Sequence, residues 1–193
     1  MHRPLPRIAE TSSSEPAAPP ATGARISRFR LLAEAVAAAG VLAGTARAAR
    51  SLSSAERSLL ARINTERLTH GLGTLRPSRL LAEVARAHDL DMARFGYFGH
   101  TSRDGAPYWR RIEQRYAPLR FYWAVGENLL SASPSIAPHA VVEAWLGSPE
   151  HRAVLLDPAW RDVGVAIVHV ASAPGVYGHQ PTTLVTADFG VRD

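Results

Sequence analysis

A helical pattern of apolar and polar positions begins at Ser53. Ser53 and Glu56 together form a capping box, which marks the N-terminus of a helix. Apolar residues then recur with a period near 3.6 up to Leu68, and Gly71 ends the pattern. The pattern predicts a helix over residues 54–70.

A second helical pattern follows Ser78, a residue type that commonly caps helices. Its apolar stripe reaches Met92 and predicts a helix over residues 79–95. His88 lies on this apolar stripe. We therefore expect His88 to be a hydrogen-bonded core residue and not a ligand.

The predicted elements in the middle of the chain are shorter. They are a helix over 108–116, an aromatic strand over 121–125 and a helix over 140–145 that ends at Gly147. Ser148 and the proline after it are typical of a new helix N-terminus.

The last part of the chain has the character of β structure. Apolar runs over 163–171 and 182–191 flank a turn at Pro174-Gly175 and predict a hairpin. Helices followed by such a hairpin indicate an α+β fold with an antiparallel sheet. We expect a single domain over residues 52–193.

The N-terminal region differs in composition from this domain. Residues 1–24 are rich in Pro, Ser, Ala and Thr, which predicts a disordered leader. Residues 25–48 combine arginines, an apolar run and a small-residue end, which fits a signal peptide cleaved near Ala49. An uncleaved membrane anchor and a soluble alanine-rich helix are the alternatives. We expect a secreted protein, or one anchored at the cell envelope.

The composition excludes several kinds of chemistry. The chain has 193 residues, no cysteine and no lysine, because all 22 basic residues are arginine. Disulfides, thiol nucleophiles, cysteine zinc sites and lysine-based catalysis are therefore excluded, and we expect no organic cofactor. The net charge is +5, and the first 48 residues carry +3 of it. The domain has little general attraction for phosphate, so we expect no nucleic-acid partner.

Three polar clusters lie between the predicted elements, where functional side chains are commonly displayed. The first, over 95–102, contains His100. The second is Gly126-Glu127-Asn128, and the third, over 145–152, contains His151. Each cluster on its own is only a weak indication of a functional site. The order of the three clusters along the chain is much more specific.

In that order the clusters resemble the CAP superfamily, secreted domains named after cysteine-rich secretory proteins, venom antigens and plant pathogenesis-related proteins. The resemblance is to its bacterial, cysteine-free branch. The residues that carry it are Asn64, Arg67, Gly71, Leu72, Leu75, Phe98, His100, Gly126, Glu127, Asn128, Trp145, Ser148, Pro149, His151, Arg152, Pro158, Val163, Gly164, Val165, Phe189 and Gly190.

The resemblance implies an α-β-α sandwich, in which a central antiparallel sheet lies between helical layers. It also implies a cleft that holds a divalent metal, often zinc, with His100 and His151 as the histidine ligands and Glu127 as the acid. Where eukaryotic members carry a second acid this chain has Ser148, and Glu150 lies nearby. The implied ligand-binding cleft comprises these five residues.

The chemistry of this cleft leaves alternatives open. Two imidazoles and a carboxylate satisfy an open zinc site, and Glu127 could instead act as a catalytic base beside the metal. No established hydrolase motif is present. A polar network that only organises the cleft is the remaining interpretation of the histidines and Glu127.

Three functions follow from these alternatives. The first is an exported, monomeric, non-enzymatic domain that binds a metal and a lipid, sterol or peptide. The second is a metal-dependent hydrolase acting on peptides or cell-envelope material. The third is a structural or adhesive module that contacts an envelope component. We favour the first, because an activated water needs a defined substrate pocket that the sequence does not indicate.

Overall fold

The structure is a computed structural model that describes residues 8–13, 51–119 and 122–193. The helices are α1 (Ser54–Thr69), α2 (Arg79–Phe95), α3 (Tyr108–Glu113), α4 (Pro138–Gly147), α5 (Pro149–Leu155) and the short 3-10 helix η1 (Gly175–Tyr177). The strands are β1 (Ile8–Ser13), β2 (Arg76–Pro77), β3 (Trp123–Ala132), β4 (Asp162–Ala173) and β5 (Gln180–Arg192).

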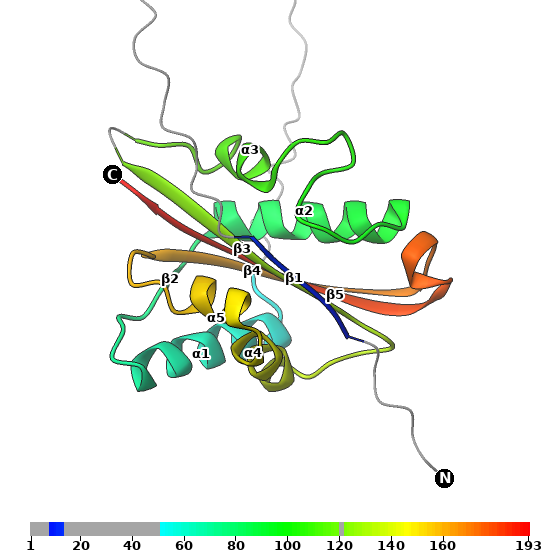
Figure 1. The fold of residues 1–193 in the computed structure, drawn as a ribbon, viewed down its shortest axis with the longest axis horizontal. Coiled ribbons are helices and arrows are strands. Elements are labelled where there is room, and N and C mark those ends of the chain that lie inside the picture. The colour runs from blue at the N-terminus through cyan, green and yellow to red at the C-terminus, as the bar shows by residue number, and fades with distance from the viewer. Residues whose placement is uncertain (1–7, 14–50, 120–121) are drawn as a thin grey trace, which may run out of the picture. The chain divides into compact units, whose positions relative to one another are not determined.

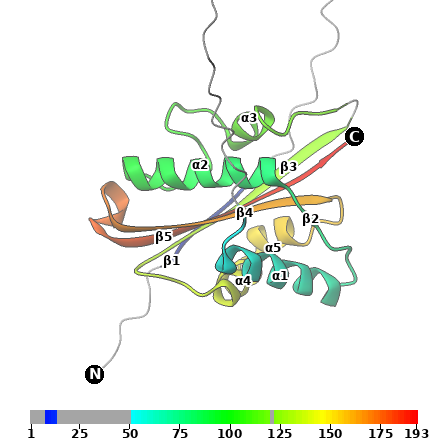
Figure 2. The ribbon, with the colours of Figure 1, turned by 180° about the vertical axis from the view of Figure 1, so that it is seen from behind.

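One sheet with helices on both faces organises the domain. The strand order is β1-β3-β5-β4-β2, and every pairing is antiparallel except that of the two-residue β2 with β4. Helices α2 and α3 cover one face, and α1, α4 and α5 cover the other (Figures 1 and 2). The predicted α+β sandwich with a central antiparallel sheet is confirmed.

The alternation of side chains along the strands divides the core into two layers. Toward α1, α4 and α5 the sheet presents apolar residues such as Leu130 of β3 and Phe189 of β5, which pack with Trp145. Toward α2 and α3 it presents Val125 and Leu129 of β3. Odd-numbered residues of β3 therefore face α2 and α3.

The start of each long helix follows the predicted capping chemistry. The capping box of Ser53 and Glu56 is present at α1, and the Ser78 hydroxyl accepts a hydrogen bond from the Leu81 N–H at α2. The third helix, α3, ends at Glu113 and is therefore shorter than the predicted helix over 108–116. Helix α4 is longer than predicted and begins with Pro138, a residue suited to the first turn.

Strand β3 is the main correction to the predicted elements. The aromatic strand was predicted to end at Val125, but β3 continues to Ala132 and includes Glu127. The residues from Val125 onward are all buried, because helices cover both faces of the sheet. A strand buried on both faces has no polar alternation, so the period-2 signal is missing.

The N-terminal region contributes β1 within the stretch predicted to be disordered. Residues 8–13 pair with β3 along six register positions. Within the predicted leader these residues form an edge strand, which is held by backbone hydrogen bonds and needs few large apolar side chains. The segment 25–48, predicted as a signal peptide or anchor, lies outside the described residues. Among the residues that are described, no helix is long and apolar enough to span a membrane.

Two of the motif residues in α1 have structural roles. The Asn64 side chain both donates to the Leu75 carbonyl and accepts from the Leu75 N–H. The buried Arg67 donates to the backbone carbonyls of Gly73, Leu155 and Asp157. These contacts tie α1 to the segment after it and to the end of α5.

Two glycines allow close backbone contacts of α2. A Cβ on Gly164 of β4 would overlap the backbone of Leu81 and Ala82, so helix and strand lie directly against each other there. At the other end of α2, Gly96 adopts the left-handed conformation with φ 71° and its carbonyl accepts from the Val176 N–H.

Candidate functional site

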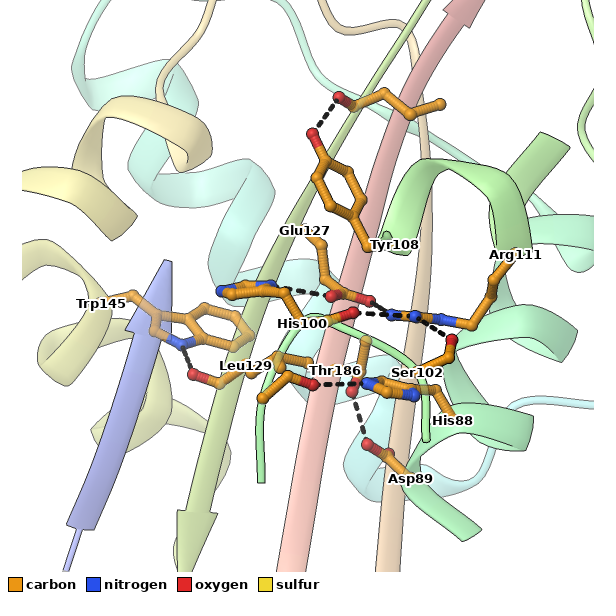
Figure 3. Close-up of polar contacts among 12 residues, drawn as sticks. His88, Asp89, His100, Ser102, Tyr108, Arg111, Glu127, Leu129, Trp145 and Thr186 are labelled. Carbon is orange, nitrogen blue, oxygen red and sulfur yellow. Dashed lines mark hydrogen bonds and ion pairs between the residues drawn. The ribbon is translucent and has the colours of Figure 1, made fainter. Parts of the chain in front are cut away.

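A hydrogen bond joins two of the predicted site residues. The Nδ1 atom of His100 lies 2.8 Å from Oε1 of Glu127, as Figure 3 shows. The prediction placed Glu127 after a strand, whereas it lies within β3, with its side chain fully buried. His100 comes from the loop after α2, and only 13% of its side chain is exposed. The Nε2 atom of His100 is buried and has no hydrogen-bond partner among the described residues.

Arg111 of α3 is the centre of the contacts around this pair. Its guanidinium bonds Oε2 of Glu127 and donates to the carbonyl of His100 at 2.9 Å and to the hydroxyl of Ser102 at 3.0 Å (Figure 3). Arg111 therefore holds the His100 loop and neutralises the buried carboxylate at once. Tyr108, also on α3, packs edge-on against the His100 ring.

The contacts of Glu127 determine its charge. Burial raises the pKa of this carboxyl, but the adjacent Arg111 and the hydrogen bond from His100 outweigh burial and lower the pKa to about 2. Glu127 is therefore ionised throughout the neutral range. A carboxylate with both oxygens engaged and such a low pKa is a weak base.

Two more acids lie on the same side of the sheet, and the sequence reasoning missed them together with Arg111. Asp188 of β5 is in register with Glu127, and Asp89 of α2 accepts a hydrogen bond from the Thr186 hydroxyl. Both acids are fully buried. Asp188 lies within the continuously buried part of β5, and an acid inside the predicted apolar run over 182–191 is the signal that could have found it.

The other predicted residues belong to α5 and its N-terminus. The Nδ1 atom of His151 lies 2.8 Å from the Ser148 hydroxyl, and the His151 carbonyl accepts from the side chain of Asn128. Ser148 is the N-cap residue of α5, as predicted, although its side chain makes no capping hydrogen bond. Glu150 is exposed in the first turn of α5.

The contacts therefore form two groups. His100 and Glu127 belong to the group on the α2 and α3 side of the sheet, whereas His151 and Ser148 belong to the α5 group. Within the described part of the chain, no three His, Asp or Glu side chains form a group that could hold a metal ion. The carboxylate of Glu127 contacts Arg111 and His100, so the geometry favours an orienting role for it over that of a third ligand.

A pocket of about 540 Å³ lies between α2 and α3, and we call it the α2–α3 pocket. Charged and polar side chains in its lining are Glu83, His88, Asp91, Ser102, Asp104, Arg110, Arg111, Gln114 and Arg115. The acids come from α2 and the loop that follows it, and the arginines from α3 and its C-terminal end. Arg111 contacts both this pocket and the His100–Glu127 pair.

The expected core role of His88 is confirmed. Its side chain is buried, and Nε2 lies 2.9 Å from the Gly99 carbonyl. Burial lowers the pKa of His88 to about 4. The imidazole is therefore neutral at pH 7, with Nε2 donating the hydrogen bond to the carbonyl.

This low pKa predicts a loss of stability in acid. Between pH 6.5 and 4 the unfolded chain binds a proton on His88 that the folded chain does not, so unfolding is favoured as the pH falls. The free energy of unfolding, measured against that of His88→Gln, should fall by about 3 kcal/mol between pH 7 and 4. Denaturant titrations of both proteins across this pH range measure the difference between their free energies of unfolding. The contributions of the other buried acids are common to both proteins and cancel in this difference. A constant difference would contradict a neutral His88.

Comparison with known proteins places these features in a family. The CAP profile, described as Cysteine-rich secretory protein family, matches residues 60–184. The chain is 33% identical over 112 residues to an uncharacterized membrane protein of Bacillus subtilis, YlbC, covering 58% of this chain and 31% of that one. It is 32% identical over 129 residues to the uncharacterized protein YkwD of the same organism, covering 66% of this chain and 48% of that one. The chain thus spans less than half of each relative.

A solved structure agrees with this assignment. The crystal structure of an extracellular protein with an SCP domain from Bacillus anthracis has a TM-score of 0.54 and 25% identity, and the match covers 72% of this chain and 40% of that one. The matched residues include the His100, Glu127 and His151 positions. The absence of cysteine agrees with the cysteine-free branch. This chain belongs to the CAP family of cysteine-rich secretory proteins.

Proposed function

We propose that this chain is an exported ligand-binding CAP domain without catalytic activity, in which His100 contacts the ligand. The observation that carries the proposal is the buried Nε2 atom of His100, which lacks a partner among the described residues while Nδ1 is held by Glu127. An imidazole fixed through one nitrogen presents the other in a defined direction. Ligand binding would satisfy that buried nitrogen.

The low pKa and the hydrogen bonds of the Glu127 carboxylate support a binding function over a hydrolytic one. A general base works best with a pKa near the operating pH, whereas the pKa of Glu127 is about 2. Both of its oxygens already contact His100 and Arg111. Glu127 thus serves to orient His100, and the metal-dependent hydrolase is the less supported alternative.

The α2–α3 pocket does not include His100 in its lining but adjoins it through Arg111, and its charges favour a peptide as the ligand. Acids on the α2 side and arginines on the α3 side suit a chain that carries donors, acceptors and charges of both signs. A lipid or sterol would leave these polar groups without partners when it displaced water. Export is supported by the signal-like residues 25–48 and by the extracellular SCP-domain protein among the similar structures.

A divalent metal is a second ligand that the donor chemistry fits. The Nδ1 atoms of His100 and His151 are hydrogen-bonded to side-chain oxygens of Glu127 and Ser148, the arrangement that orients metal-binding histidines. Because the two histidines belong to different contact groups, zinc held by both imidazoles would have to bridge these groups, and there it would polarise a bound group as a Lewis acid.

Titration with zinc tests this site. We expect wild-type protein to bind zinc at neutral pH and to release it as the pH falls through ~6.5, because protonated imidazole has no lone pair for the metal. The double variant His100→Ala/His151→Ala should lose most of the affinity in a calorimetric titration. The exposed His139 of α4 provides a matched control, and His139→Ala should bind as wild type does.

Two results would contradict the proposal. Equal zinc binding by wild type and the double variant would leave the polar-network interpretation in place of the metal site. Cleavage of a general peptide library that a chelator abolishes would contradict a non-enzymatic domain, and the hydrolase would then be preferred.

A further inference from the structure

Asp188 is a buried acid that the proposed ligand site does not use. In the sheet it lies directly opposite Glu127, and both side chains face α2 and α3. Neither oxygen of Asp188 has a hydrogen-bond donor among the described residues. A buried carboxyl without any donor is costly, so its state needs an explanation.

The charges around Asp188 do not balance if every acid is ionised. The charges that act on Asp188 are those of Glu127 on β3, Asp89 on α2 and Arg111 on α3, while its register neighbour on β4 is Gly164. Arg86 of α2 also acts on Asp89, but the guanidinium that contacts a carboxylate of this group is that of Arg111. His88, which acts on Glu127, is neutral at pH 7. Uncompensated charge is strongly unfavourable in a buried site. Two protons on the carboxyls would leave the remaining negative charge paired with Arg111.

The contacts decide which acids hold these protons. Glu127 makes the ion pair with Arg111 and accepts from His100, so it keeps its charge. Asp89 contacts a hydroxyl and Asp188 contacts no cation, so the protons belong to these two (Figure 3 shows the Asp89 contact). Burial raises the pKa of Asp188, and the negative charge of Glu127 raises it further.

We propose that Asp188 is held as a neutral carboxylic acid whose O–H donates a hydrogen bond to Glu127. Asp188 is then a positioning residue. Together with His100 and Arg111 it supplies a third donor to the Glu127 carboxylate and fixes the direction in which His100 points. The pair carries one negative charge, which Arg111 neutralises. This inference does not depend on which ligand binds His100.

The charge of Asp188 can be read directly from the side-chain carboxyl ¹³C shift of the labelled full-length chain. We expect the shift of a protonated acid for Asp188 at pH 7. The ionised shift at pH 7 would overturn the proposal. The measurement needs no substitution, so it does not depend on whether a variant folds, and the shift of the exposed Asp104 in the same spectrum serves for comparison.

Two variants test the donor role independently. Asp188→Asn keeps an N–H that can donate to Glu127, whereas Asp188→Leu has a similar volume and no donor. We expect Asp188→Asn to melt near the wild-type temperature and Asp188→Leu to melt well below it. Equal melting temperatures for the two variants would show that Asp188 donates nothing to Glu127, which would overturn the proposal.

Discussion

Trp145→Ala should lower the free energy of unfolding by about 3–5 kcal/mol. The indole is fully buried between α4 and the sheet, in the same cluster as Leu59 of α1 and Phe189 of β5. Its Nε1–H also donates to the Leu129 carbonyl at 3.2 Å. Alanine would remove the largest fully buried side chain of this layer, and no disulfide compensates in a chain without cysteine.

Denaturant titration measures this loss, and two variants separate its causes. Trp145→Phe keeps most of the apolar volume but leaves the Leu129 carbonyl without its donor, so we expect a loss of about 1–3 kcal/mol. The exposed Tyr122 is the control, and Tyr122→Ala should change stability by less than about 1 kcal/mol. An unchanged midpoint for Trp145→Ala would mean that the core lies elsewhere.

The second large effect is expected at Arg111. Arg111→Ala leaves Glu127 as a buried charge without a cation, and removal of one partner from a buried ion pair costs about 3–5 kcal/mol. It also removes the donor to the His100 carbonyl and to Ser102. We therefore expect lower stability and weaker zinc binding together.

A double-mutant cycle isolates the charge contribution. Glu127→Gln removes the charge that Arg111 neutralises, so Arg111→Ala should cost much less in the Glu127→Gln background. Arg110 is the matched control on α3, because it is exposed and lies over Trp109, and Arg110→Ala should cost less than about 1 kcal/mol. Purely additive losses in the cycle would show that the ion pair contributes no coupling.

Local signals in the sequence were enough to predict the helices and the family. Capping residues and apolar period placed α1 and α2 within one residue of their observed ends. The core position of His88 followed from the same stripe. The motif residues identified His100, Glu127 and His151, because a family motif encodes contacts that no single local pattern contains.

Contacts between distant segments were not predictable in this way. Arg111 lies 16 residues before Glu127, and nothing in its surroundings distinguishes it from the exposed Arg110 beside it. Its role depends on the packing of α3 against β3. Strand β1 was missed for a related reason, because backbone pairing with a distant strand leaves little trace in composition.

The glycine contacts of α2 also fix one wall of the α2–α3 pocket. Gly164 holds one end of this helix against β4, and Gly96 holds the other against the turn at Gly175, so the α2 wall stays with the sheet. The opposite wall, α3, is six residues long and contacts the sheet through side chains, among them Tyr108, Arg111 and Ile112. The two walls are therefore joined to the sheet differently: α2 approaches it backbone to backbone, whereas α3 is held through side chains, of which Arg111 also neutralises the buried Glu127.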